Sequence, residues 1–366
     1  MAWYDHKFSN QYEEAKKVLK NETFADSWKK LVQSLVKLMG DTGFNAGDAG
    51  NLDELRKKSS RGADKGWFKG YEKIGEDEGL LAATGDPTKT AINGKTRKKA
   101  AALKFLRHVY LLKKWGSHKV WIHSLPTDFS DWPHWAFDSG TDVNVKTLLR
   151  SNSEKFSEEQ KKNLSHSTQE AIKWCQKTLI VIANAAAKSN GRTKTKALEL
   201  VKRWFADENT TDEELNNYIS ELSRGFKSIL GTLNRGQIIL TDFPTLRNAS
   251  NPSEVGLKMS EAFVWALANR EPLDVVYIEE EFFGSKNVLT GLTNWTRILI
   301  HELSHLVCGT TDVKPGPRYA WYGIAPNAAN FPGAKAITNA ENWAFFAADC
   351  AGALSDSERN RALTVK

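Results

Sequence analysis

The stretch Ile298-Leu-Ile-His-Glu-Leu-Ser-His-Leu-Val307 decides how this chain is interpreted. Residues four apart lie on the same face of a helix, so His301 and His305 can bind one metal ion together. Glu302, between them, is placed to deprotonate a water molecule at that metal. Apolar residues recur around the motif at helical spacing, which favours a buried helix over a solvent-exposed one. They are Leu292, Trp295, Ile298, Leu299 and Leu306.

A third metal ligand is needed, because a hydrolytic zinc usually has three protein ligands and one open position. The nearest downstream acid is Asp312, in Gly309-Thr-Thr-Asp312. Gly309 is suited to end the helix and turn the chain back, which could bring the Asp312 carboxylate to the metal. We therefore expect one zinc ion, bound by His301, His305 and Asp312.

Three segments together resemble the motifs of the aspzincin metalloendopeptidases, the group of deuterolysin and the peptidyl-Lys metalloendopeptidases. They are His301-Glu-Leu-Ser-His305, Gly309-Thr-Thr-Asp312 and Tyr319-Ala-Trp-Tyr322-Gly323, and the similarity extends upstream to about Ser165. The resemblance implies that His301, His305 and Asp312 bind zinc and that Glu302 is the general base. It also implies that a tyrosine, Tyr319 as first choice and Tyr322 as second, donates a hydrogen bond to the oxyanion.

The later segment Asn339-Ala-Glu-Asn-Trp-Ala-Phe-Phe346 resembles a helix of the family that carries two acids. In the lysine-specific members these acids recognise the substrate's ammonium group. Glu341 stands at the first position, where the resemblance implies substrate binding, but Ala344 occupies the second. A single acid would attract a cation only weakly. In the competing gluzincin arrangement, Glu341 would itself be the third metal ligand, although it lies much further along the chain than Asp312.

The composition indicates packed domains, since 40% of the 366 residues are hydrophobic and 13 are Trp. We expect an α+β fold, mostly helical, with a zincin-like metallopeptidase domain that has a small sheet and an active-site HExxH helix. The polar segment at 151–162 predicts a boundary between a helical N-terminal region, residues 1–150, and a metallopeptidase domain, residues 151–366.

Hydrophobic periodicity predicts the individual elements. Helices are expected at 8–19, 24–39, 96–115, 165–188, 195–205 and after Thr211, with a further helix at 261–268, and strands at 119–123, 237–241 and 274–278. Thr211-Asp-Glu-Glu214 is typical of a capped helix start. The 274–278 strand is a candidate for pairing with the backbone of a substrate.

The net charge of +7 makes a nucleic-acid partner the second function class. The densest basic run, 95–114, also has a helical apolar face, so a solvated basic helix explains it better. A nucleic-acid partner is therefore not favoured. The aromatic segment 128–137 predicts a packed cap, and its His134 with Asp128 and Asp131 is a weaker metal-site alternative.

The sequence has no run of 18 apolar residues, so no transmembrane segment is expected. The first residues lack a basic stretch followed by an apolar core, and the three cysteines describe no disulfide framework. We expect synthesis in the cytoplasm without a general secretory signal. One hypothesis is a peptidase delivered as a toxin or effector, with residues 1–150 contacting a secretion-system or immunity partner. Alternatives are an intracellular housekeeping protease, a zinc hydrolase of cell-wall amides and a non-catalytic binding module.

Overall fold

The computed structural model of the protein describes residues 7–45, 47, 50, 54–55, 80, 82–85, 94–111, 120–123, 156–243, 246, 252–284, 288–313 and 319–364. The aromatic segment 128–137, with its alternative metal site, and most of residues 41–95 lie outside this set. The chain forms two compact units. The first comprises Met1–Glu159, Gln237–Lys258 and Glu271–Tyr277, and the second Gln160–Gly236, Met259–Arg270 and Ile278–Lys366. The predicted division at 150/151 thus lies near the end of the first long segment, but two later segments also belong to the first unit.

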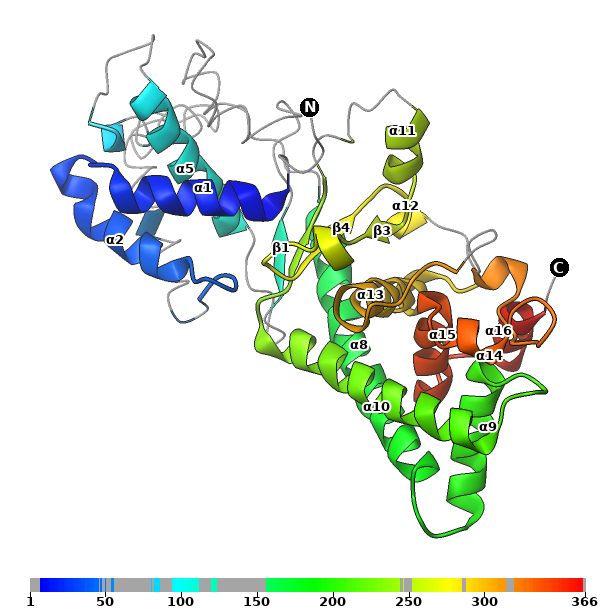
Figure 1. Cartoon of the computed structure of the whole chain (residues 1–366). Coiled ribbons are helices and arrows are strands. Elements are labelled where there is room, and N and C mark those ends of the chain that lie inside the picture. Colours follow the sequence, from blue (N-terminus) through cyan, green and yellow to red (C-terminus); the bar gives the residue numbers. More distant parts are fainter. Residues whose placement is uncertain are drawn as a thin grey trace. The chain divides into compact units, whose positions relative to one another are not determined.

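The first unit combines helices with three short parallel strands (Figure 1). Its described elements are α1 (Phe8–Asn21), η2 (Asp26–Trp28), α2 (Lys29–Leu38), α5 (Gly94–Leu111), β1 (Trp121–His123), β2 (Ile239–Thr241), α11 (Pro252–Lys258) and β4 (Val275–Ile278, whose last residue belongs to the second unit). Trp121 lies opposite Ile239, which lies opposite Val275. All residues of these three strands whose burial is described are buried, as expected for parallel pairing.

Aromatic packing and one buried carboxylate hold the first unit together. Phe44 lies against Trp121 and Tyr12, with ring centroids 4.9 and 5.1 Å apart. Glu271 accepts hydrogen bonds from the backbone N–H and the hydroxyl of Ser9 and from the hydroxyl of Tyr277. These bonds satisfy a carboxylate that would otherwise be costly to bury, and they fix the start of α1.

The second unit is mostly helical (Figure 1). Its described elements are α8 (Glu158–Ala185, whose first two residues belong to the first unit), α9 (Arg192–Phe205), α10 (Asp212–Arg235), β3 (Ala262–Phe263), η6 (Leu267–Asn269), α12 (Glu281–Gly284), α13 (Gly291–Cys308), η7 (Ala320–Tyr322), α14 (Gly333–Ala336), α15 (Ala340–Ala351) and α16 (Asp356–Leu363).

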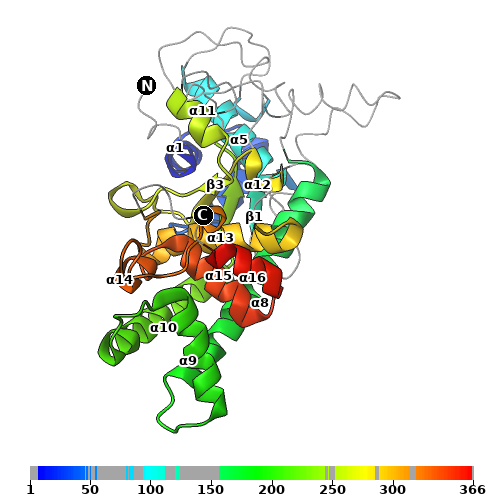
Figure 2. The same cartoon turned by 90° about the vertical axis from the view of Figure 1, so that its right-hand side faces the viewer.

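Helix α13 is the centre of the second unit, because α10 and α15 both pack against it. Helix α9 lies beside α10 and also packs against α15 (Figure 2). Trp343 of α15 stacks on Phe226 of α10, with ring centroids 5.3 Å apart. Gly225 allows this approach, since a Cβ there would lie 2.3 Å from two ring carbons of Trp343. The three cysteines are free thiols.

The described helices and strands confirm most of the predicted elements, with shifted ends. Thr211 and Glu214 form the expected capping box at the start of α10, and α8 already begins within the polar segment predicted as a boundary. The predicted helix at 261–268 is wrong. Its residues form β3 and a 3₁₀ turn instead, because the Glu261 carbonyl pairs with the N–H of Glu279 and Leu267 adopts a φ of 54°.

The overall class is mostly helical with one small four-stranded sheet. Among the described helices, none combines the length and the apolar character that crossing a membrane requires.

Candidate metal centre and active site

Helix α13 positions both histidines of the motif. His301 and Glu302 are buried, and His305 is partly buried. The helix ends at Gly309, whose φ of 73° is the left-handed conformation that glycine adopts without strain. This ending was expected from the sequence.

The turn after α13 is fixed by its two threonines. The hydroxyl of Thr310 lies 2.7 Å from that of Ser304, and the Thr310 carbonyl accepts a 2.7 Å hydrogen bond from Nδ1 of His305. Thr311 pairs with the segment before α15, donating to Thr338 and accepting from Ala340. The next residue, Asp312, is thereby held beside the histidines.

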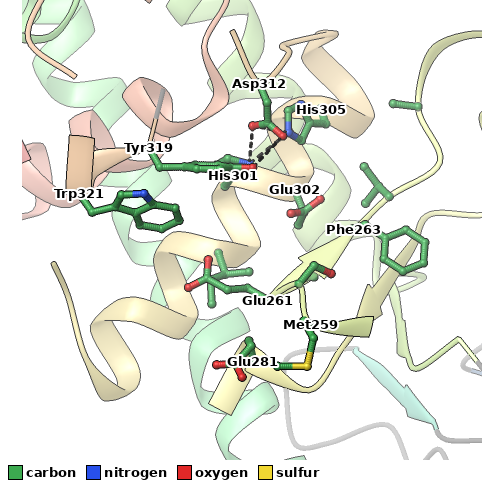
Figure 3. Close-up of a pocket in the computed structure, with 15 residues that line it drawn as sticks. Met259, Glu261, Phe263, Glu281, His301, Glu302, His305, Asp312, Tyr319 and Trp321 are labelled. Carbon is green, nitrogen blue, oxygen red and sulfur yellow. Dashed lines mark hydrogen bonds and ion pairs between the residues drawn. The ribbon is translucent and has the colours of Figure 1, made fainter. Parts of the chain in front are cut away.

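Three ligand atoms converge here (Figure 3). The Nε2 atoms of His301 and His305 lie 3.1 Å apart, and Oδ1 of Asp312 lies 3.3 and 3.5 Å from them. One atom from each residue lies within 4.8 Å of the other two. Oδ1 of Asp312 is buried and has no hydrogen-bond partner among the described residues. The structure thus brings together all three residues predicted as metal ligands.

The donor set fits a zinc ion. Each histidine uses Nδ1 for a protein acceptor, Oε2 of Glu341 for His301 and the carbonyl of Thr310 for His305. Both Nε2 lone pairs are then available to a metal, which is the usual arrangement of metal-binding histidines. Two imidazoles and one carboxylate leave a fourth position open in a tetrahedral site.

The charges of the site are those of a cation-binding centre. Burial lowers the pKa of His301, but the neighbouring carboxylates of Asp312 and Glu341 outweigh it and raise this pKa to about 10. Burial raises the pKa of Asp312, yet the two imidazoles bring it well below its usual range. Both shifts show that the carboxylates around the two imidazoles favour a positive charge at this place.

Glu302 lies next to the cluster and lines the same cavity. Its carboxylate is not one of the three converging ligands. Burial raises its pKa, and the opposing effect of His301 and His305 is smaller. A raised pKa increases the proton affinity of the carboxylate, which is what a general base near neutral pH requires.

The two candidate tyrosines are placed differently. Tyr319 lines the cavity, and its hydroxyl donates a 3.1 Å hydrogen bond to Oδ2 of Asp312. Tyr322 is 53% exposed and is not among the lining residues. Trp321, which the sequence analysis did not single out, lines the cavity instead, with its ring centroid 4.6 Å from that of Tyr319.

Glu341 is fully buried and does not face the open cavity. Its Oε2 lies 2.9 Å from Nη1 of Arg297 and 3.1 Å from Nδ1 of His301, and its Oε1 accepts a hydrogen bond from the N–H of Ala320. Burial raises its pKa, but Arg297 and His301 outweigh this and lower it to about 2. Because Glu341 contacts Nδ1 of His301, it lies on the side of the ring away from the metal cluster. Asp312, and not Glu341, therefore lies in the cluster with the two Nε2 atoms that could hold a metal ion.

The cavity has a volume of about 550 Å³ and all its lining residues belong to the second unit. One wall is α13 with the metal cluster, and another is the segment Ser260–Val264, which contains β3 (Figure 3). The strand predicted to pair with substrate, 274–278, contributes no lining residue. Glu281 and Glu261 add two acids to the wall.

Residues 186–348 match the family described as lysine-specific metallo-endopeptidases, the aspzincins. Residues 186–348 form an aspzincin domain. The match includes every residue of the metal cluster, Glu302, both tyrosines and Glu341, and it begins somewhat after the predicted start near Ser165. The family uses zinc to hydrolyse peptide bonds, so this domain is a zinc peptidase by membership. No curated protein sequence matches the chain.

Arg297 and β3 are features of the aspzincin domain that the sequence analysis missed. Arg297 is four residues before His301 and therefore on the same helix face, a spacing that could have drawn attention to it. β3 is only two residues long, too short for a periodic signal.

Proposed function

We propose that the aspzincin domain is an endopeptidase that binds one zinc ion through His301, His305 and Asp312. The convergence of these three ligand atoms, with Oδ1 of Asp312 buried and facing both Nε2 atoms, is the observation that carries the proposal. Zinc, when bound, would polarise the scissile carbonyl and lower the pKa of a water molecule in the cavity.

Glu302 acts as the general base in this mechanism. Its buried carboxylate takes a proton from the attacking water and returns it to the leaving amine. Tyr319 is the tyrosine placed to stabilise the oxyanion, because its hydroxyl reaches the metal cluster from the cavity wall. Its hydrogen bond would pass from Asp312 to the oxyanion as negative charge develops there.

The substrate would lie along β3. Backbone pairing to an edge strand is a common way to bind an extended peptide, and the segment Ser260–Val264, which contains β3, lines the cavity. We propose this segment in place of the 274–278 strand. The wall of the cavity would then hold both the peptide backbone and the side chains beside the scissile bond.

The family is described as lysine-specific, and the acids that a substrate cation would meet differ from those expected. Glu341 is occupied by Arg297 and His301. Glu281 and Glu261 line the cavity, but Glu261 is also paired with Arg297, so we propose that Glu281 provides the negative charge for a cationic side chain. Delivery as a toxin or effector, an immunity partner at residues 1–150, and the housekeeping and cell-wall alternatives stay predictions from the sequence.

The test is digestion of unfolded casein by the full chain, with fragment ends mapped by mass spectrometry. Cleavage should disappear with a chelator, return with added zinc, and be absent from Asp312→Asn. Fragment ends next to lysine would support selection by Glu281, and loss of that lysine preference in Glu281→Gln would support it further. A zinc-loaded wild type that cleaves no peptide bond would contradict the proposed function.

A further inference from the structure

The aspzincin domain contains a buried arginine that the peptidase mechanism does not use. Arg297 lies on α13 with its side chain 1% exposed, one turn before the metal ligand His301. A buried cation is costly unless it is paired and its N–H groups are bonded. Each terminal nitrogen of Arg297 contacts a different carboxylate, and Nε donates a 2.9 Å hydrogen bond to Asn294.

The first carboxylate, Glu341, connects Arg297 to a residue of the metal cluster. Nη1 of Arg297 lies 2.9 Å from Oε2 of Glu341, and the same oxygen lies 3.1 Å from Nδ1 of His301. An acceptor at Nδ1 fixes the ring orientation and leaves Nε2 free for the metal. The other oxygen of Glu341 binds the N–H of Ala320, next to Tyr319. One carboxylate thus orients a metal ligand and holds the segment that carries the cavity tyrosine.

The second carboxylate, Glu261, connects Arg297 to the cavity wall at Ser260–Val264, along which we propose that the substrate lies. Nη2 of Arg297 forms an ion pair with Oε2 of Glu261, which immediately precedes β3. The other oxygen, Oε1, is buried without a hydrogen-bond partner among the described residues. Glu261 lines the cavity, and the guanidinium of Arg297 that holds Glu341 also holds Glu261 in place.

We propose that Arg297 is a positioning residue that orients His301 through Glu341 and the wall at β3 through Glu261. The planar guanidinium suits this role, since it presents N–H groups in fixed directions to both carboxylates. A lysine would supply the charge but not the two directions. Glu341 is accordingly a second positioning residue and not a substrate-binding one. The proposal rests on the proposed function, on its zinc site for the role of Glu341 and on its peptide-binding wall for the role of Glu261.

The chain provides a matched control on the same helix as Glu341. Asp349 is also a buried carboxylate of α15, with its side chain 2% exposed, and it is bound by Arg203 and Arg359. Among the described residues, its side chain bonds to Arg203, Trp204 and Arg359 and not to the metal cluster. Asp349→Asn therefore breaks a comparable buried ion pair without changing the partners of His301.

The experiment measures zinc affinity of the full chain by competition with a chromophoric chelator, together with the melting temperature. Glu341→Gln should weaken zinc binding by about 10- to 100-fold, the usual effect of losing a partner of a metal-binding histidine. Arg297→Lys should weaken it less, because the charge remains. Asp349→Asn should lower the melting temperature and leave zinc affinity unchanged. Unchanged affinity in Glu341→Gln, or an equal loss in the control, would overturn the proposal.

A kinetic measurement tests the second part of the proposal, the role of Glu261 at the cavity wall. With zinc at saturation, Glu341→Gln should lower kcat, whereas Glu261→Gln should raise KM for peptide substrates and leave zinc affinity at the wild-type value. A change in kcat alone for Glu261→Gln would contradict its assignment to the wall. If Glu341→Gln fails to fold, the zinc affinity of Arg297→Lys still tests whether the buried ion pair orients His301. If the wild type cleaves no peptide, the proposed function fails, while the zinc measurements still judge the role of Arg297.

Discussion

Replacing Glu302 with Gln should remove peptidase activity without removing zinc. The side chain is buried and lines the cavity, and the isosteric Gln preserves its packing. What is lost is the proton affinity of a carboxylate whose pKa burial has raised. A positioned general base contributes about 10²- to 10⁴-fold to the rate, which corresponds to about 3–5.5 kcal/mol of transition-state stabilisation. We therefore predict a fall in kcat by at least two orders of magnitude.

Glu302→Asp tests whether position matters as much as basicity. This change keeps the carboxylate but withdraws it by one methylene, roughly 1.5 Å. A misplacement of about 1 Å can cost on the order of 100-fold, so Glu302→Asp should also be strongly impaired. Zinc should bind to both variants with wild-type affinity, because the carboxylate is not one of the three converging ligands.

The assay is the initial rate of cleavage of a quenched fluorescent peptide, with bound zinc measured in the same samples by mass spectrometry. Both variants should be nearly inactive and fully loaded with zinc. A Glu302→Gln variant with zinc bound and a rate within about tenfold of wild type would refute the base assignment. Loss of zinc from Glu302→Gln would instead refute the separation of the base from the ligand set.

Three further predictions follow from particular contacts. Tyr319→Phe should lower kcat by about 10²-fold or more if its hydroxyl stabilises the oxyanion, and Tyr322→Phe should have a much smaller effect, so steady-state kinetics of the two variants identifies the tyrosine. Gly225→Ala should destabilise the fold by about 1–3 kcal/mol through overpacking against Trp343. Gly231→Ala, on the same helix with no atom near the added Cβ, should stabilise the fold by about 0.5–1 kcal/mol. Thermal unfolding measures both free-energy changes, and equal effects would contradict the packing argument. Zinc at about 1,000 times its dissociation constant should stabilise the folded chain by about 4 kcal/mol, visible as a melting temperature that a chelator lowers, and a shift of the same size in Asp312→Asn would exclude Asp312 as a ligand.

The local parts of the site could be predicted from the sequence. His301 and His305 share a helix face because of their spacing, and this requires no knowledge of the fold. Gly309 ends α13 because glycine adopts positive φ without strain, and this places Asp312 within reach. The capping box of Thr211 and Glu214 is equally local. Each of these signals acts over seven residues or fewer.

The remaining parts of the site depend on contacts between distant residues. Glu341 lies 44 residues after Arg297, and nothing in its own segment shows that an internal cation would occupy it. The segment at 261–268 has apolar residues that resemble a helix pattern, yet it is held as β3 by pairing with Glu279. Sequence periodicity reports which face of an element is buried, but it does not report which partner covers that face.

The acidic side chains that line the cavity contrast with the positive net charge of the whole chain. The net charge is +7, which alone suggests an anionic partner. Yet the described lining of the cavity contains Glu261, Glu281, Glu302 and Asp312 and no lysine or arginine. Arg297 lies behind this wall, where its charge is taken up by Glu341 and Glu261. Charges act on a substrate mainly over distances shorter than about 10 Å at moderate salt. We therefore expect the acidic lining, and not the basic total, to decide which substrates enter the site, and we expect it to favour a cationic peptide.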